Sequence, residues 1–141
     1  MVLIADTGPL VALADRADGY HEAIKAYAAG RRDTWILPAP VVTESAITIL
    51  DRLGADEELG FLRAIAAKEL HVEPTTDADL QRTIEILDQY RDARFGMVDA
   101  ATMAIAERLK IEVILTVDKR DFGIFRPKHC AAFRLVPEGL R

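Results

Sequence analysis

Two aspartates that directly follow aliphatic segments are the first candidates for chemistry. Asp6 follows the run Val2–Ala5, and Asp118 follows the run Val113–Val117. In an open sheet of parallel strands, ligands bind beyond the carboxyl ends of the strands, so both side chains lie where a ligand is expected. Either aspartate taken alone is explained equally well by a hydrogen bond in the turn that leads into a helix.

Two further acids lie in apolar helical segments. Glu44 has Val41 and Ile47 three positions away on either side, which predicts that it is at least partly buried, although an ion pair with an arginine would also explain it. Asp99 precedes the apolar run Ala100–Ala106 and on its own could be a helix cap. If the four acids meet at one sheet edge, a cation is needed, since two carboxylates about 4 Å apart repel by about 4 kcal/mol at an effective dielectric near 20.

The ligand types predict which cation this would be. Oxygen ligands without a histidine nearby favour Mg²⁺ or Mn²⁺ over zinc. Such an ion lowers the pKa of a bound water, positions that water and neutralises charge on a leaving oxygen, which is the chemistry of phosphodiester hydrolysis. The histidines, His21, His71 and His129, lie in other segments and are interpreted as surface or structural residues.

The elements that must position these acids alternate between strand and helix patterns. Strands are predicted over Val2–Ala5, Trp35–Leu37, Leu70–Val72, Val113–Val117 and Ala132–Val136. Helices are predicted over Pro9–Ala14, Tyr20–Ala29 and Val98–Leu109, and also from Val42 to Leu53, from a cap at Asp56 to Lys68, and from a Thr76/Asp79 capping box to Tyr90. The Val98–Leu109 segment is apolar nearly all round, which predicts a central helix. The alternation indicates a parallel α/β sheet with right-handed crossovers in one domain over residues 1–141.

Composition excludes several classes of protein. The chain has 141 residues, of which 50% are hydrophobic and 6% aromatic, and this balance suits helices packed on aliphatic strands. Its apolar runs near the N-terminus are too short for a signal peptide or a membrane span. The single cysteine, Cys130, allows no internal disulfide and favours a reducing, cytoplasmic location. The net charge of −5 argues against binding nucleic acid mainly by neutralising phosphates, yet it leaves a metal-assisted enzyme possible.

Four segments, in this order, resemble the PIN-domain ribonucleases, and most closely the VapC toxins of bacterial toxin–antitoxin pairs. They are the opening LIADTGPL from Leu3 to Leu10, the acid Glu44 after Pro-x-Pro-Val-Val, the helical Val98-Asp99-Ala100-Ala101, and Thr116-Val117-Asp118 followed by Lys-Arg-Asp-Phe. An aspartate after a strand is common, so no single segment is specific, whereas the ordered set is. The resemblance covers essentially the whole chain.

This resemblance implies a Rossmann-like sheet with strand order 3-2-1-4-5 and a Mg²⁺-dependent endoribonuclease in which Mn²⁺ can substitute. It also implies a homodimer and a VapB-like antitoxin that blocks the cleft. By position, the metal-binding and catalytic quartet is Asp6, Glu44, Asp99 and Asp118, with Thr7 and Thr116 as accessory hydroxyls. Asp121 either joins the pocket edge as a fifth acid or faces solvent. Contacts to RNA phosphates are expected from Arg91, Arg94, Lys119 and Arg120, although these could also be a solvated charged surface.

Three alternatives compete with the nuclease interpretation. A phosphorylatable receiver domain has a similar length and class, but it needs paired acids after the first strand, and Asp6 is followed by Thr7. A phosphatase of the DxD type needs a second aspartate where Gly8 stands. A PIN fold that has lost activity and serves only as a binding module is not supported, because all four acids are present.

Overall fold

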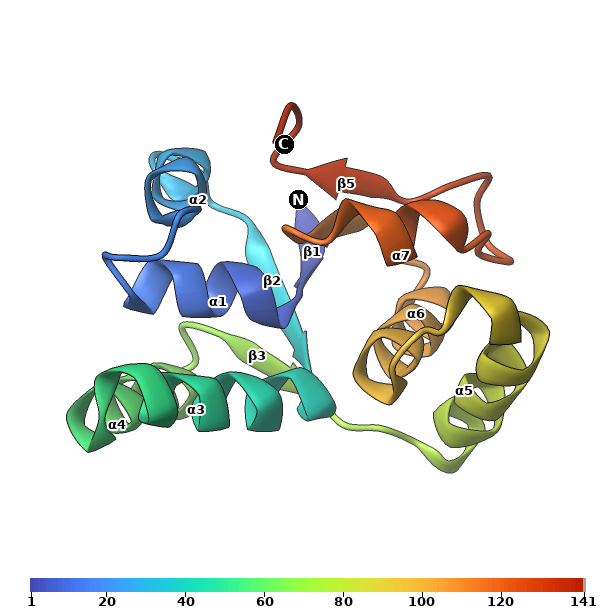
Figure 1. Cartoon of the computed structure of the whole chain (residues 1–141), viewed down its shortest axis with the longest axis horizontal. Helices are drawn as coiled ribbons and strands as arrows, with labels where there is room; N and C mark the ends of the chain where they lie inside the picture. Colours follow the sequence, from blue (N-terminus) through green and yellow to red (C-terminus); the bar gives the residue numbers. More distant parts are fainter. Residues whose placement is uncertain (141) are drawn as a thin grey trace.

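A parallel sheet forms the centre of the computed structural model, which describes residues 1–140 (Figure 1). Its strands are β1 (Val2–Ala5), β2 (Thr34–Pro38), β3 (His71–Glu73), β4 (Val113–Leu115) and β5 (Arg134–Val136). Every neighbouring pair is parallel, and the order across the described sheet is β3-β2-β1-β4-β5, which confirms the predicted topology. The α/β fold is therefore the one that the alternating pattern predicts.

Helices cover both faces of this sheet. They are α1 (Thr7–Ala14), α2 (His21–Ala28), α3 (Ala39–Leu53), α4 (Ala55–Ala66), α5 (Asp77–Gln89), α6 (Met97–Leu109) and α7 (Lys119–Ile124), with a short 3₁₀ turn, η1 (Arg91–Ala93), before α6. In Figure 1, α1 to α4 lie on one side of the strands and α5 to α7 on the other. None of the helices in residues 1–140 has both the length and the apolarity to cross a membrane.

The central strand joins two hydrophobic cores. Leu3 and Ala5 of β1 pack in the core that faces α1 and α3, whereas Ile4 packs in the core that faces α5 and α6. Successive side chains of a strand point to opposite faces, so a short aliphatic run with no polar residue is what a strand buried on both sides needs. Helix α6 is buried from Ala100 to Ala106 without interruption, which confirms its predicted central place.

Several element ends differ from the sequence-based prediction, and two of them change an interpretation. Helix α4 is capped by Gly54, which has a φ of 96°, so Asp56 lies in the first turn of α4 and is not its cap. Helix α6 is capped by Gly96, so Asp99 is the third residue of α6 and not its cap. The predicted capping box of Thr76 and Asp79 is present at the start of α5.

The end of β4 also differs, and this matters for the site. Strand β4 stops at Leu115, two residues earlier than predicted, and the chain turns through Thr116 and Val117 into α7, which was not predicted. The backbone N–H of Asp118 donates to the Thr116 hydroxyl at 2.9 Å, which stabilises this turn. Asp118 therefore lies at the N-cap of a helix, just beyond the sheet edge.

Candidate metal centre

Asp6 is the most deeply buried of the predicted site residues. It lies between β1 and α1, with 6% of its surface exposed, and its carboxylate oxygen Oδ2 accepts a 3.0 Å hydrogen bond from the Thr116 hydroxyl. The pKa of Asp6 is raised to about 6, chiefly by burial and to a smaller extent by the charges of Glu44 and Asp118, while hydrogen bonds from Thr7 and Thr116 oppose the rise. A buried carboxylate with acidic neighbours is a group that a cation would stabilise.

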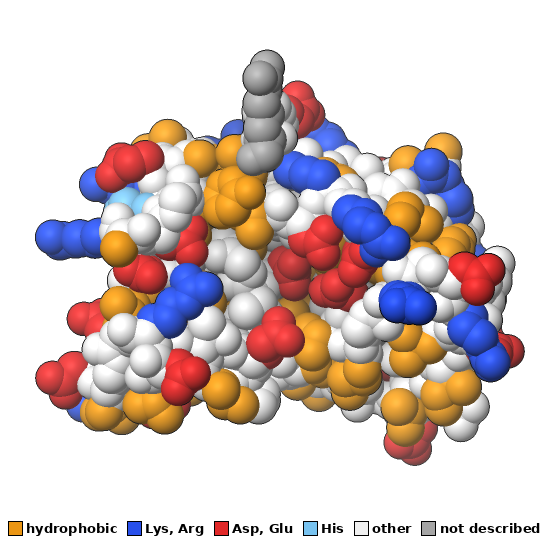
Figure 2. Space-filling view, viewed as in Figure 1, with side chains coloured by type: hydrophobic (Ala, Val, Ile, Leu, Met, Phe, Trp, Pro, Cys, Tyr) orange, Lys and Arg blue, Asp and Glu red, His pale blue; other side chains and the backbone are white. Residues whose placement is uncertain are grey.

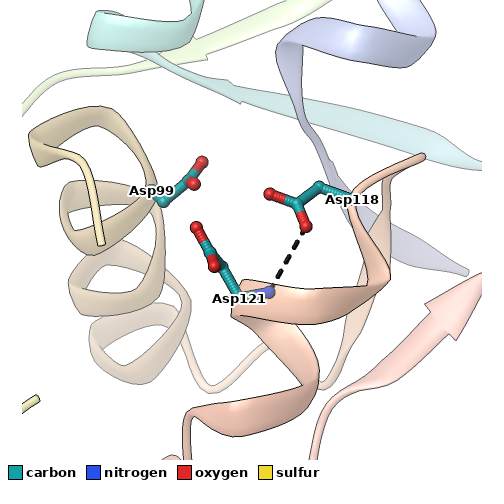
Figure 3. A group of neighbouring side chains, drawn as sticks. All are labelled: Asp99, Asp118 and Asp121. Atoms are coloured by element: carbon teal, nitrogen blue, oxygen red, sulfur yellow. Dashed lines mark hydrogen bonds between the residues drawn. The ribbon is translucent and has the colours of Figure 1, made fainter. Parts of the chain in front are cut away.

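Helix α7 brings a second and a third carboxylate to the same place. Asp118 caps α7, because its Oδ1 accepts from the backbone N–H groups of Arg120 and Asp121 at 3.0 and 3.3 Å. The alternative explanation of Asp118, a hydrogen bond in the turn that leads into a helix, is therefore confirmed. The same carboxylate also points toward Asp99 (Figure 3). Asp121, one turn later, is 9% exposed and so does not face solvent.

Asp99 completes a compact group of three acids. Asp99 from α6 and Asp118 and Asp121 from α7 point toward one another (Figure 3), and one carboxylate oxygen from each lies within 4.8 Å of the others. The pKa of Asp99 is raised to about 8. Burial is the largest cause, and the charge of Asp6 and a hydrogen bond with Asp121 are the next largest. Without a cation, the raised pKa means that Asp99 holds its proton more tightly than an ordinary aspartate does.

Glu44 lines the same pocket as Asp99 and Asp118 and is less buried than predicted. Its side chain is exposed, because the buried stripe of α3 runs through Val41, Ser45 and Ile49, and the neighbour Ile47 is itself 60% exposed. The prediction of a partly buried glutamate was therefore wrong. Glu44 nevertheless lies near enough to raise the pKa of Asp6.

All four predicted acids line one pocket of about 410 Å³. Asp6, Glu44, Asp99 and Asp118 share this pocket with Thr7, Gly8 and residues at the start of α6. We call it the carboxylate pocket. The two accessory hydroxyls differ, because Thr116 is fully buried and bonded to Asp6, whereas the hydroxyl oxygen of Thr7 is buried without a hydrogen-bond partner in residues 1–140.

The donor set fits a hard divalent cation. Asp6, Asp99, Asp118 and Asp121 offer carboxylate oxygens at one sheet edge, and neither histidine nor cysteine lines the carboxylate pocket in the described chain. Oxygen-only sites with several carboxylates suit Mg²⁺ or Mn²⁺, which keep some of their water ligands. Figure 2 shows acidic side chains gathered near the centre of this face of the molecule.

The predicted phosphate-binding residues have different environments. Lys119 donates to the backbone oxygen of Pro137 at 3.0 Å, and Arg120 contacts both Asp121 and the backbone oxygen of Ala93. Arg91 pairs with Asp88 on the surface. Arg94, which ends η1, is exposed. Arg91, Arg94 and Arg120 are thus exposed and Lys119 is partly buried, while Arg120 also neutralises part of the acid cluster.

Sequence similarity decides the family. The PIN domain family model matches residues 3–125, which is most of the chain. The chain is also 31% identical over 135 residues to Ribonuclease VapC26 of Mycobacterium tuberculosis (strain ATCC 25618 / H37Rv), and this match covers 96% of the chain and 100% of the relative. The chain belongs to the PIN-domain family. Within that family its similarity is to VapC proteins, as the resemblance of the four segments implied.

Solved structures confirm the PIN fold independently. VapC20 of Mycobacterium tuberculosis, described as a sarcin-ricin loop cleaving toxin, superposes with a TM-score of 0.74 at 19% identity, over 79% of this chain and 86% of that one. The VapBC2 structure from Rickettsia felis, bound to a promoter DNA fragment, matches with a TM-score of 0.68 at 13% identity, over 96% of this chain and 98% of that one. At these identities the likeness concerns the fold.

One residue of this PIN domain's site was left open by the sequence. The carboxylate of Asp121 lies in the group of three with Asp99 and Asp118. From the sequence, its spacing of three residues from Asp118 fitted a solvent-facing position equally well. The missing information was α7, because only a helix beginning at Asp118 turns Asp121 back toward Asp99. A helix of six residues is too short for its periodicity to be recognised.

Proposed function

We propose that this PIN domain is a metal-dependent endoribonuclease that hydrolyses RNA phosphodiester bonds, with Mg²⁺ as the natural ion and Mn²⁺ as a substitute. The observation that carries the proposal is the convergence of Asp6, Glu44, Asp99 and Asp118 on one pocket. The raised pKa values of Asp6 and Asp99 support it, because they indicate a concentration of negative charge that a cation would relieve. The similarity to a ribonuclease of the VapC group supports the same reaction.

Each acid has a proposed role. Asp6 and Asp99 hold the metal directly, while Glu44 and Asp118 act through water or hold a second ion. Asp121 is a further ligand or a hydrogen-bond partner of Asp99. When bound, the ion supplies an activated water and neutralises charge on the leaving oxygen. Thr116 orients Asp6 through its hydrogen bond, and the proposed role of the Thr7 hydroxyl, which is buried without a partner in residues 1–140, is to hydrogen-bond a carboxylate or the attacking water.

Cations beside the acids supply the attraction that the net charge lacks. Lys119 and Arg120 are the first two residues of α7. Arg94 directly follows η1, and Arg120 donates a hydrogen bond to the backbone oxygen of Ala93 in η1. We propose that Arg94, Lys119 and Arg120 contact RNA phosphates near the cut, and that Arg91 contributes more weakly because Asp88 already pairs with it. Phosphate contacts of this kind position a nucleic acid without reading its sequence.

The proposed partner is a VapB-like antitoxin that covers the carboxylate pocket in the cytoplasm. Solved relatives of the same fold include a toxin–antitoxin complex from Klebsiella pneumoniae, with a TM-score of 0.68 at 15% identity. We also propose that the chain forms a homodimer within the complex. Co-expression with its antitoxin, followed by sedimentation of the complex and of the isolated chain, measures both assemblies.

RNA cleavage by the purified chain tests the reaction. The protein, freed of any copurified partner, is incubated with total RNA in Mg²⁺, Mn²⁺ or EDTA, beside an Asp6→Asn/Asp99→Asn variant and an Asp51→Asn control that alters an exposed acid on α3. We expect discrete fragments with the wild type and the control in metal only, and the mapped ends give the cut site. Intact RNA in every lane, with all proteins folded, would favour a PIN fold that serves only as a binding module.

A further inference from the structure

The guanidinium group of Arg120, beside the acids, is held by two parts of the chain. Its Nη1 and Nη2 atoms donate to the backbone oxygen of Ala93 at 3.0 and 3.1 Å. Nη1 also donates to Oδ1 of Asp121, with which Arg120 forms an ion pair. Ala93 lies in η1, which leads into α6, whereas Asp121 lies in α7. The guanidinium group therefore connects the two helices that position Asp99 and Asp118.

Two N–H groups of the Arg120 side chain remain unused. A guanidinium group has five, one on Nε and two on each of Nη1 and Nη2. Three of them serve Ala93 and Asp121, and the side chain has no further hydrogen-bond partner within residues 1–140. The remaining two, on Nε and Nη2, point in the same direction along one edge of the planar group. Such an edge binds two oxygens of one phosphate or carboxylate at once.

This free edge is accessible, although the group that carries it is fixed. The Arg120 side chain is 62% exposed, whereas that of Asp121 is 13% exposed. Asp121 in turn lies in the group of three with Asp99 and Asp118 (Figure 3). A single carboxylate thus separates the guanidinium group from the other acids. Figure 2 shows basic side chains directly beside the acidic ones near the centre of the face. An anion held at these acids would therefore lie beside the free edge of Arg120.

Asp121 balances the positive charge of Arg120. An unpaired arginine beside a divalent cation would repel the cation and weaken its binding. The ion pair of Arg120 and Asp121 has little net charge, so Arg120 can lie near the metal ligands without this repulsion. A carboxylate already neutralised by a guanidinium group also attracts a cation less strongly than a free carboxylate does. These contacts favour a role for Asp121 in holding Arg120 over a role as a metal ligand.

Building on the proposed nuclease function, we propose that Arg120 is a catalytic residue that binds the phosphate to be cut, and that Asp121 is a positioning residue that orients Arg120. The free edge donates to two oxygens of that phosphate, on which negative charge increases as water attacks. Because Ala93 and Asp121 hold the guanidinium group before the substrate arrives, little side-chain freedom is lost when the phosphate binds.

Cleavage kinetics test the role of Arg120 with a short oligonucleotide that contains the mapped cut site, called the mapped oligonucleotide. Arg120→Gln should lower kcat about 10- to 100-fold with little change in KM, the usual effect of losing a hydrogen bond to a charged group in the transition state. Arg120→Lys should stay impaired, because lysine keeps the charge but lacks the planar edge. A raised KM at unchanged kcat, or a fully active Arg120→Lys, would overturn the proposal.

Another paired arginine provides a matched control. Arg52 on α3 is 49% exposed, forms ion pairs with Asp15 and Asp18, and does not line the carboxylate pocket. Arg52→Gln should therefore cleave the mapped oligonucleotide like the wild type. Thermal unfolding of each variant establishes that the compared proteins are folded.

The affinity for Mn²⁺ tests the role of Asp121 without catalysis. It is measured by electron paramagnetic resonance on the RNA-free protein. Asp121→Asn leaves the charge of Arg120 unbalanced, so the affinity should fall about three- to tenfold. Adding Arg120→Gln to that chain should return the affinity to within about twofold of the wild type, because the charges balance again. Removing Arg120 cannot replace a lost ligand, so an affinity that stays low in the double variant overturns this role of Asp121.

The two residues should also be coupled in cleavage. At saturating Mn²⁺, Asp121→Asn should lower kcat in the wild-type chain and lower it little further in the Arg120→Gln chain, because no guanidinium group remains to be oriented. Losses that multiply would show that the two residues act independently, and the proposed positioning would be wrong.

The outcomes separate this inference from the nuclease proposal. Metal-dependent cleavage that is equally fast in the wild type, Arg120→Gln and Asp121→Asn refutes the inference and leaves the nuclease intact. An absence of metal-dependent cleavage of any RNA by the folded wild type refutes both.

Discussion

At the scale of single residues, Thr116 links two of the acids that come from different parts of the chain. Its hydroxyl donates to Asp6 Oδ2 at 3.0 Å and accepts from the backbone N–H of Asp118 at 2.9 Å. Thr116 is fully buried, so both bonds are sheltered from competing water. The distance between the end of β1 and the start of α7 is thus held partly by one hydroxyl group.

Replacing Thr116 with valine should therefore impair the site more than the fold. We expect Thr116→Val to lower RNA cleavage about 10- to 100-fold, as losing a hydrogen bond to a metal-ligating group typically does. The free energy of unfolding should fall by about 1–2 kcal/mol. Thr116→Ser should restore most of the activity. Thr83→Val is the control, because the buried Thr83 hydroxyl donates to the Asp79 carbonyl oxygen within α5, and Thr83 does not line the carboxylate pocket. If both valine variants cleave RNA equally well, Thr116 does not position the acids.

The raised carboxyl pKa values predict how the metal-free protein responds to pH. The pKa of Asp99 is raised to about 8 and that of Asp6 to about 6, mainly by burial. Between about pH 4 and pH 8 the folded state therefore binds more protons than the unfolded chain, so the free energy of unfolding should fall as the pH rises through this window.

Thermal unfolding in EDTA from pH 5 to pH 9 measures this effect. At pH 8 we expect Asp99→Asn to be more stable than the wild type by at least about 1.4 kcal/mol, the equivalent of one pKa unit. Asp51→Asn, an exposed change on α3, should behave like the wild type. A wild-type Tm that rises steadily from pH 5 to pH 8 would contradict the account.

At the scale of elements, the start of α1 is pressed against the turn that follows β4. A Cβ atom added at Gly8 would lie 2.5 Å from Cγ2 of Val117. Valine is branched and stiff, so it cannot turn away, and the backbone would have to shift. Because Asp6 and Asp118 flank these two residues, such a shift would separate the acids.

Gly8→Ala should accordingly reduce both stability and cleavage. We expect a loss of about 1–3 kcal/mol in urea unfolding, the usual cost of overpacking. Val117→Ala in the same chain should recover much of that loss, since it removes the clashing methyl group. Gly60→Ala on α4 is the matched control, because nothing lies within 4 Å of its added Cβ, and it should be neutral or stabilising. A Gly8→Ala protein as stable and active as the wild type would show that the contact is not restrictive.

The elements also show what the sequence could and could not predict. The parallel sheet and the placement of Asp6 and Asp118 beyond its strands were predictable, because buried strands read as aliphatic runs and crossovers have one hand. The order of the strands was predicted only from the resemblance to PIN domains. Glu44 was misjudged because one apolar neighbour, Ile47, faces solvent and so gave a false buried face. Helix α7 was missed because it has six residues and carries little periodicity. Predicting Asp121's position required that helix.

At the scale of the whole molecule, β1 and α6 tie the two cores together. Strand β1 contributes to both cores, and α6 is buried continuously from Ala100 to Ala106. Neither helical layer can separate without exposing this shared apolar surface. We therefore propose that the chain unfolds as one domain.

Calorimetry measures this cooperativity. We expect one transition with equal calorimetric and van't Hoff enthalpies, and an enthalpy of about 100 kcal/mol from the usual value of about 0.7 kcal/mol per residue. Two resolved transitions, or a van't Hoff enthalpy about half the calorimetric one, would show that the two layers unfold separately.

The central claim, that the converging acids form a metal site for RNA hydrolysis, is tested most directly by the rate of cleavage as a function of free Mg²⁺. The mapped oligonucleotide is incubated with the wild type and with Asp99→Asn across a Mg²⁺ titration that begins in EDTA. We predict no cleavage in EDTA, a saturable rise for the wild type, and a rate at least about 100-fold lower for Asp99→Asn at every concentration. Cleavage that persists in EDTA, or an Asp99→Asn rate equal to that of the wild type, would contradict the account.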